Sequence, residues 1–334
     1  MRRALLAAAL LGALVAAPAA DAADPCAPWS DRVVAEGLGS LENVEVDAHG
    51  GLLVSASDQD GIVRITRDGK SRVLVPDVVS PGGLRVRRGV LWFNTHDTLQ
   101  SGLSDRPDGT LERFDLTTRK RTVFARDIIM PNGLVFLPNG NALTSRDIGG
   151  PPAIYVVPRK SPAKHRAWAQ TDDSNGMAVD PTGRFVYAVQ TFKFDSPLLR
   201  IPISNPSKIE VFARLGDAKG LDDMTIDRDG ILYIAANATG EIIRFNPRTK
   251  RSCTIAGGVD AGWRNTSAVK FGCGPGWRSD HLFAVGFDGV VHELTPPGAG
   301  PHATGDCRDH FVRRHGPRRA RNPRHFAPSG SSRK

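Results

Sequence analysis

A short pattern of polar and apolar positions recurs six times along the chain. In most copies a polar residue is followed by a small or polar residue, an apolar residue, any residue, and then Val, Ile or Phe. The six copies are ENVEV, GGLRV, NGLVF, NGMAV, DDMTI and SAVKF, and they begin at positions 42, 82, 132, 175, 222 and 267. The intervals are 40, 50, 43, 47 and 45 residues, which indicates a chain built from repeats of one unit.

Each copy leads into further segments with the pattern of short strands. A turn such as DAHGG or DPTGR comes first, then a β-rich segment such as LLVSA or FVYAV, and then third and fourth strands such as EIIRFN and RVLVPDV. Four short strands in about 45 residues, with Gly and Asp turns between them, are typical of propeller blades. Alternating strands and Asn/Asp-Gly turns favour antiparallel hairpins, and no helical period separates them. The pattern therefore predicts an all-β fold, a six-bladed β-propeller.

The sixth unit has only three strands before the C-terminal segment. The missing outer strand has a counterpart near the other end of the chain, because RVVAEGLGS at 32–40 matches the outer strand RVLVPDVVS at 72–80. An N-terminal strand that completes the last blade would close the ring and remove its open sheet edges. We predict one propeller domain over residues 24–307, closed in this way.

The N-terminal region has the pattern of a secretory signal peptide. Two arginines precede an apolar run of 14 residues, and Ala20-Asp21-Ala22 forms a small-residue cleavage site. The run is shorter than the roughly 20 residues that span a bilayer, which argues against a transmembrane anchor. We predict a signal peptide over residues 1–23 and a mature chain in the extracellular or periplasmic (cell-envelope) space.

The net charge of +9 is concentrated in the C-terminal segment. Residues 308–334 carry nine Arg and Lys and one Asp, whereas residues 24–307 have no net charge. The segment is rich in Arg, Pro, Gly and Ser without a sustained apolar period, so we expect a basic disordered tail. It could contact an anionic cell envelope weakly, or be a solvated extension. The neutral core gives no support to nucleic-acid binding.

Four cysteines in an exported chain favour disulfides, and four cysteines allow three pairings. Cys26 and Cys307 flank the two ends that ring closure would bring together, so we expect them to pair. The remaining pair would be Cys253 with Cys273. No CxxC motif occurs, and a zinc site is therefore not expected.

The residues that open the inner strands would share one mouth of the central channel. They are Glu42, Gly82, Asn132, Asn175, Asp222 and Ser267. Carboxylate and carboxamide oxygens suit Ca²⁺, and less specifically Mg²⁺ or Mn²⁺. Asn and Asp also begin strands because they favour turns, but Glu is not a turn former. Glu42 therefore favours a metal site. In addition, the carboxylates of Glu42 and Asp222, confined in one channel, would repel each other without a cation between them.

These residues carry a resemblance to the SMP-30/gluconolactonase/LRE-like family of six-bladed propellers, which includes regucalcin and is related to strictosidine-synthase-like proteins. The resemblance runs from Glu42 to about Leu294, through PNGLVFLPNG, SNGMAVDPTGRFVYAV, LDDMTIDRDGILYIAANATGEIIRFNP and NTSAVKFG. It implies one divalent-metal site formed by Glu42, Asn132, Asn175 and Asp222. It also implies that the Asp is the general base. Members that hydrolyse sugar lactones carry an arginine two residues before the first Asn ligand, where this chain has Met130, so the substrate is left open.

The activity implied by the resemblance is metal-dependent hydrolysis of a lactone or related cyclic ester, with Ca²⁺ favoured over Zn²⁺, Mn²⁺ and Mg²⁺. A bound cation can polarise the ester carbonyl, and a carboxylate can take the proton of the attacking water. Asp222 is the candidate for that base. Asp223 is the reserve, although a strand period of two would turn it away from the axis.

Substrate contacts are expected from the loops that join second and third strands, because these open on the same mouth. These loops contain His96, Asp97, Arg146, Asp147, Phe192, Phe194, Asn237 and Asp288. The candidates chosen from them are Arg146, Asp147, Phe192 and Asn237, with His96 as an acid/base auxiliary because its pKa is ordinarily near neutrality. Each taken alone is also compatible with an ordinary loop residue. No G-x-S-x-G elbow and no phosphate-binding glycine loop with a lysine occurs.

Two other functions remain open at this stage, because propellers host many activities. One is a non-enzymatic propeller that binds a glycan or a protein and holds calcium structurally. The other is a strictosidine-synthase-like enzyme, against which the retained set of metal ligands argues. The small-molecule partner expected for the leading hypothesis is a lactone or cyclic ester.

Overall fold

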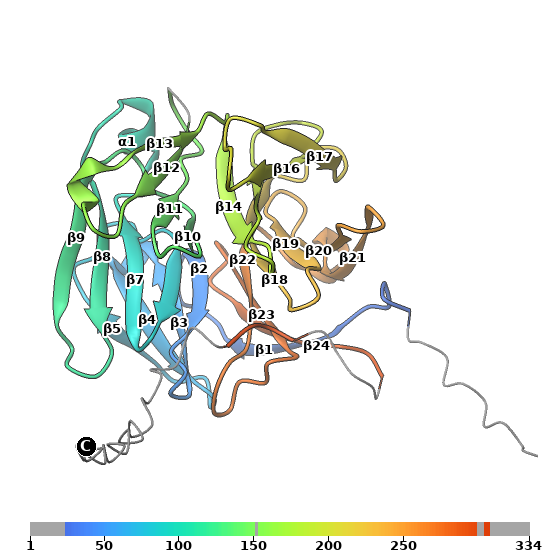
Figure 1. The fold of residues 1–334 in the computed structure, drawn as a ribbon. Coiled ribbons are helices and arrows are strands. Elements are labelled where there is room, and N and C mark those ends of the chain that lie inside the picture. Colours follow the sequence, from blue (N-terminus) through green and yellow to red (C-terminus); the bar gives the residue numbers. More distant parts are fainter. Residues whose placement is uncertain (1–23, 151–152, 299–303, 308–334) are drawn as a thin grey trace, which may run out of the picture.

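The computed structural model describes residues 24–150, 153–298 and 304–307. The predicted signal peptide at 1–23 and the predicted tail at 308–334 lie outside these residues. Within the described ranges the chain forms six antiparallel sheets of four strands each, arranged as the blades of a β-propeller (Figure 1). The all-β, six-bladed prediction is confirmed.

The strands follow one another blade by blade. Blade 1 comprises β2 (Leu41–Val46), β3 (Gly51–Ala56), β4 (Gly61–Thr66) and β5 (Ser71–Val75), and blade 2 comprises β6 (Leu84–Arg87), β7 (Val90–Thr95), β8 (Gly109–Asp115) and β9 (Arg121–Ile128). Blade 3 comprises β10 (Leu134–Phe136), β11 (Ala142–Thr144), β12 (Ile154–Val157) and β13 (Arg166–Ala169), and blade 4 comprises β14 (Ser174–Val179), β15 (Phe185–Gln190), β16 (Pro197–Pro202) and β17 (Glu210–Arg214). Blade 5 comprises β18 (Leu221–Ile226), β19 (Leu232–Ala236), β20 (Glu241–Asn246) and β21 (Arg251–Gly257), and blade 6 comprises β22 (Thr266–Phe271), β23 (Leu282–Gly286), β24 (Val291–Thr295) and β1 (Ser30–Ala35).

The N-terminal strand closes the ring, as the sequence predicts. β1 pairs with β24 in the register Ser30 with Thr295 and Val33 with His292, so the first described strand is the outer strand of the last blade. The strand lies slightly earlier than the segment expected from the sequence. The six inner strands contact their neighbours in a closed circle around the axis, in the order β2, β6, β10, β14, β18, β22 and back to β2.

Apolar side chains fill the spaces between adjacent blades. Leu198 of blade 4, for example, packs in one cluster with Leu221 and Phe245 of blade 5, and all three are fully buried. Burying one such side chain stabilises the fold by about 1.5–3 kcal/mol. Helices are short, namely α1 (Leu99–Leu103), η1 (Ser57–Gln59), η2 (Pro162–Lys164) and η3 (Val259–Ala261). None in the described ranges is long and apolar enough to cross a membrane.

Four inner strands begin with a β-bulge. The register with the second strand shifts between Leu41 and Val44, between Ser174 and Met177, between Leu221 and Met224, and between Thr266 and Ala268. A bulge inserts an extra residue and breaks the strict alternation of side chains. Two consecutive residues at the start of these strands can therefore both face the channel. We call this end of the channel the upper mouth, and the end where the inner strands finish the lower mouth.

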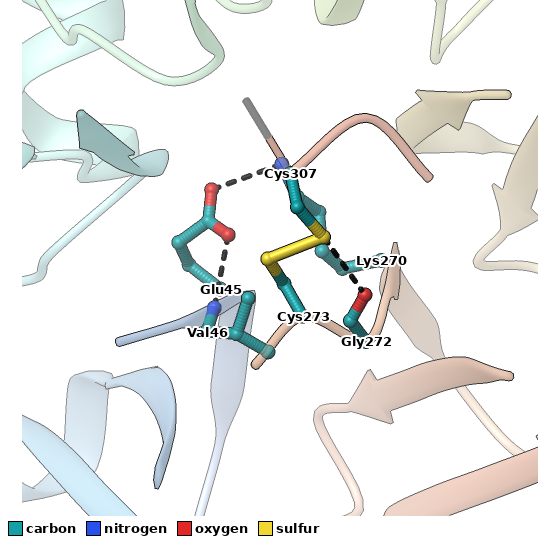
Figure 2. Close-up of a disulfide and its surroundings, with 6 residues drawn as sticks. All are labelled: Glu45, Val46, Lys270, Gly272, Cys273 and Cys307. Atoms are coloured by element: carbon teal, nitrogen blue, oxygen red, sulfur yellow. Dashed lines mark hydrogen bonds and ion pairs between the residues drawn. A yellow bond between two sulfur atoms is a disulfide. The ribbon is translucent and has the colours of Figure 1, made fainter. Parts of the chain in front are cut away.

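All four cysteines are in disulfides, but the expected pairing is wrong. Cys26 bonds to Cys253 and Cys273 bonds to Cys307. The segment before β1 runs along the outer strand of blade 5, where the Trp29 amide donates to the carbonyl of Ile255 at 2.8 Å, and this brings Cys26 to β21. Cys307 instead lies at the lower mouth, beside Cys273 (Figure 2). Ring closure therefore does not bring Cys26 and Cys307 together.

Candidate active site

The four predicted metal ligands lie at the upper mouth. Glu42 is in β2, Asn175 in β14 and Asp222 in β18, while Asn132 precedes β10. The three later residues are buried, and Glu42 is partly exposed. The Asn132 amide donates to Glu42 Oε1 at 3.5 Å, which links blades 3 and 1. The structure therefore places all four residues around one end of the channel, with Asn132 and Glu42 in direct contact.

Two loop carboxylates join this group. Asp147 follows β11 and accepts a hydrogen bond from the Asn175 side-chain amide, with 3.3 Å between Nδ2 and Oδ2. Asp97 follows β7, and its carboxyl interacts with Glu42 and with the side chain of Asn132. The sequence predicts that Asp147 contacts substrate, and it places Asp97 on a loop of the same kind. Both residues lie on loops that join a second and a third strand, and this location was the sequence signal for a place at the upper mouth.

Burial and mutual repulsion raise the pKa values of these carboxyl groups. The pKa of Glu42 rises to about 8, because of burial first and then the charges of Asp147 and Asp223. Burial raises the pKa of Asp147 to about 7. The pKa values of Asp97 and Asp222 are raised well above the ordinary range by burial and then by the charge of Glu42. Crowded acids of this kind favour a positive charge among them.

The donor atoms fit a hard cation. The buried oxygens without a hydrogen-bond partner among the described residues include Oδ1 of Asp97, Asp147, Asn175, Asp222 and Asp223. A buried oxygen without a partner costs about 1–3 kcal/mol, and carboxylate and amide oxygens are the ligands that Ca²⁺ takes. No group of three or more His, Cys, Asp or Glu side chains in the described ranges is arranged to hold an ion. The predicted ligand set contains two residues of these types, Glu42 and Asp222, and two asparagines, so it does not form a group of three.

Asn237 holds the candidate base in place. Its side-chain amide donates to Asp222 Oδ2 at 3.2 Å, so that Oδ1 of the same carboxylate is the oxygen left without a partner. The sequence predicts that Asn237 contacts substrate. The structure shows it in contact with Asp222, on the loop that follows β19.

The prediction that Asp223 faces away from the axis is wrong. Asp223 is buried, and its Oδ2 accepts a hydrogen bond from Asn43 of blade 1 at 2.7 Å and lies 3.5 Å from Arg85 Nη2 of blade 2. These partners lie across the channel from blade 5. The bulge at the start of β18 is the reason, because it places Asp222 and its neighbour on the same side of the strand.

Arg146 is a buried structural residue and does not line the open mouth, contrary to expectation. Its side chain is 0% exposed. The guanidinium donates to the carbonyls of Ile148 and Gly102, each at 2.7 Å, and pairs with Asp105. These contacts fix the loop after β11 against α1.

The two remaining predicted site residues are His96 and Phe192. His96 has a left-handed backbone (φ 61°), and its Nδ1 lies 3.1 Å from the Thr95 hydroxyl. Within the described part of the chain its ring makes no hydrogen bond or ion pair with a site carboxylate. Phe192 is 60% exposed on the loop after β15, so its ring is open to solvent or substrate.

Fold and site together define a six-bladed β-propeller whose upper mouth is lined by carboxylates and carboxamides. The family model described as SMP-30/Gluconolactonase/LRE-like region matches residues 145–278, which confirms the resemblance to that family. The match includes Asn175 and Asp222 and covers a shorter span than the resemblance noted from the sequence. No curated protein sequence matches this one.

Solved structures share the fold at low sequence identity. A gluconolactonase from Xanthomonas campestris is 16% identical with a TM-score of 0.65, and the match covers 80% of this chain and 90% of that one. The calcium-binding protein regucalcin from Agrobacterium tumefaciens is 18% identical with a TM-score of 0.60, covering 84% and 96%. A virginiamycin B lyase from Staphylococcus aureus is 14% identical with a TM-score of 0.52, covering 81% and 89%. At these identities the likeness establishes the fold.

Proposed function

We propose that the protein is a secreted, divalent-metal-dependent hydrolase of a lactone or related cyclic ester. The observation that carries the proposal is the set of buried, unpartnered oxygens at the upper mouth of a propeller that resembles gluconolactonases. The two disulfides support the exported location, because disulfides persist in oxidising compartments.

The ligands in this proposal are Glu42, Asn132, Asn175 and Asp222. When bound, a divalent cation such as Ca²⁺ supplies polarisation of the ester carbonyl and lowers the pKa of water. Asp147 contributes indirectly, since it accepts a hydrogen bond from the Asn175 amide nitrogen and so turns the amide oxygen, which has no partner, away from itself.

Asp222 is the proposed general base. Oδ1 of Asp222 would hold the cation, and Oδ2, whose position Asn237 fixes, would accept the proton of the water that attacks the carbonyl carbon. The later return of that proton to the departing alkoxide opens the ring. Met130 is 4% exposed and carries no charge, so a sugar acid gains no ion pair from this position.

A panel of lactones assayed with and without chelator tests the proposal. We expect turnover that chelator abolishes and that added Ca²⁺, Zn²⁺ or Mn²⁺ restores. Metal-bound protein without turnover of any ester would instead support a propeller that binds a glycan or a protein and uses calcium structurally. Turnover that persists in full with excess chelator would contradict the metal site.

A further inference from the structure

Exposed apolar side chains gather at one end of the propeller. Ten large apolar side chains are exposed among the described residues. Seven of them lie on connections at the upper mouth and three on outer strands, whereas no lower-mouth connection in the described ranges exposes one. Five of the seven lie on loops between second and third strands, the loops expected to contact substrate. We call these five the apolar rim, and they are Leu99, Leu103, Phe192, Phe194 and Phe287.

The apolar rim adjoins the candidate active site from two sides. Leu99 follows Asp97 by two residues, so their Cα atoms are at most about 7.6 Å apart. On the other side, the hydroxyl of the threonine before Phe192 donates to the carbonyl of Leu221 at 2.8 Å, and Leu221 directly precedes Asp222. Both sides of the rim are therefore connected to carboxylates of the upper mouth.

The helix α1 presents its leucines to solvent at this end of the propeller (Figure 1). Leu99 and Leu103 are four residues apart and hence on one helix face, and they are 63% and 71% exposed. Ser101 and Gly102 are instead buried, and a Cβ on Gly102 would lie 2.4 Å from Met130 Sδ. A surface helix ordinarily turns its apolar face to the core. Packing within the described chain therefore does not explain the outward leucines.

The orientation of α1 is fixed by hydrogen bonds on its inner side. The Thr98 hydroxyl accepts a hydrogen bond from the Ser101 amide at 3.0 Å and caps the helix. The Gly102 carbonyl accepts one at 2.7 Å from Arg146, whose side chain is 0% exposed. Because a roll of the helix would remove a partner from a buried guanidinium, the leucines are held outward by the fold.

We propose that the substrate is a lactone with an alkyl chain and that the apolar rim binds this chain. The proposal rests on the proposed function, since it places the lactone ring at the oxygens of the upper mouth. Met130 is 4% exposed and uncharged, so it offers no ion pair to an acidic substrate. The hydroxyls of a sugar lactone would lose water at the apolar rim without gaining partners. A lipid surface is disfavoured as the occupant, because it would also cover unpartnered acids at the same mouth.

Titration calorimetry of the full chain with two lactams tests the rim by binding alone. Lactams keep the ring shape and the carbonyl of a lactone but resist hydrolysis. We expect γ-nonalactam, which carries a pentyl chain, to bind at least about tenfold more tightly than γ-butyrolactam, because each buried methylene favours binding. Equal affinities, or no heat from either lactam at millimolar concentration, would overturn the proposal.

Hydrolysis of the corresponding lactones separates this proposal from the proposed function. We expect kcat/KM to be at least about tenfold higher for γ-nonalactone than for γ-butyrolactone, since the chain contributes binding energy. Tighter binding of γ-nonalactam without turnover of either lactone would contradict the hydrolase and support the apolar site. Turnover of both lactones with equal kcat/KM would support the hydrolase and contradict the apolar site.

Two double variants assign the chain to the rim. Leu99→Gln with Leu103→Gln changes only exposed side chains, and it should reduce the ratio of the two lactam affinities at least threefold. The matched control is Val73→Gln with Val211→Gln, which removes two exposed apolar side chains from outer strands and should keep the wild-type ratio.

The other side of the rim is tested by Phe192→Ser with Phe287→Ser, which should also reduce the ratio. If both rim variants keep the wild-type ratio, the chain binds elsewhere and the proposal is wrong. Sedimentation with phosphatidylcholine vesicles tests the other occupant, and we expect the protein to remain in solution. Vesicle binding that Leu99→Gln with Leu103→Gln abolishes, together with equal lactam affinities, would assign the rim to a lipid surface instead.

Discussion

The two mouths of the channel use the same six inner strands but treat charge in opposite ways. At the lower mouth the buried ions have partners, as in the Lys270–Glu45 pair at 2.9 Å. At the upper mouth acids stand beside acids, and oxygens of Asp147, Asn175 and Asp222 have no partner among the described residues. Burial of paired charges can be tolerated by a fold, whereas burial of unpaired acids costs stability. The difference supports the proposed metal site at the upper mouth.

The backbone explains how the same inner strand supplies side chains to both mouths of the channel. Bulges at the starts of β2 and β18 present Glu42 with Asn43, and Asp222 with Asp223, to the channel. After the bulge the ladder is regular, so alternate side chains such as Glu45 on β2 and Lys270 on β22 reach the lower part of the channel. The dense acidic group is therefore confined to one end.

Substitution of the proposed base should have the largest effect on the upper mouth. Asp222→Asn keeps the shape and one coordinating oxygen but removes the charge and the base. We expect lactone turnover to fall by about 10²- to 10⁴-fold, as is typical when a general base is removed. Steady-state kinetics at saturating metal measures this loss.

A ligand-only variant separates the two roles of Asp222. Asn175→Ala removes a coordinating oxygen and no base, so its activity should recover as the metal concentration is raised. If Asp222→Asn recovers in the same way, Asp222 is a ligand only. The base would then be sought at Asp147 or His96.

At the lower mouth, removal of one partner should cost stability. Lys270→Met leaves the Glu45 carboxylate buried at 1% exposure without its cation. Loss of one member of a buried pair typically costs about 3–5 kcal/mol. We expect chemical denaturation to show a decrease of that size in the free energy of unfolding, and a change below about 1 kcal/mol would contradict the buried pair.

The acids of the upper mouth should make the chelated protein less stable as pH rises. The folded-state pKa values of Glu42 and Asp147 are raised to about 8 and about 7. A carboxyl with a raised pKa contributes stability below its unfolded pKa, near 4, and loses it as pH rises through the folded value. The melting temperature of the chelated protein should therefore fall between pH 5 and pH 8, as thermal unfolding can measure.

Two controls sharpen this pH dependence. Added Ca²⁺ should reduce the fall, because the cation competes with protons for the same oxygens. Asp147→Asn should also reduce it, because it removes one of the raised groups. A melting temperature that rises from pH 5 to pH 8 in chelator would show that the upper-mouth acids do not dominate this range.

The repeat made the fold and the shared location of the four candidate ligands predictable. The positions of Glu42, Asn132, Asn175 and Asp222 follow from blade register alone, because each opens its repeat. Ring closure by β1 was predictable for the same reason. The sixth repeat lacks its outer strand, and an additional copy of the outer-strand pattern lies before the first repeat. These features depend on periodicity, which a single sequence shows directly.

Features that depend on local backbone geometry were not predictable in this way. The bulge in β18 turned Asp223 toward the axis, against a period of two. The disulfide pairing depends on where the chain runs after β24, and no repeat constrains that segment. Arg146 has the residue type of a substrate contact, yet its contacts with Ile148, Gly102 and Asp105 make it part of the scaffold.

The smallest expected effect concerns substrate affinity at the rim of the upper mouth. Phe192 is 60% exposed, and the adjacent Thr191 hydroxyl donates to the carbonyl of Leu221 at 2.8 Å, which fixes this loop beside the start of β18. Phe192→Ala should raise KM several-fold for a lactone with an apolar substituent and leave kcat unchanged, because the ring would bind substrate and transition state alike. Val211→Ala, an exposed apolar residue on the outer strand β17, is the control and should change neither constant. Equal KM values for wild type and Phe192→Ala would remove Phe192 from the substrate site, and a fall in kcat would mean that the loop positions Asp222.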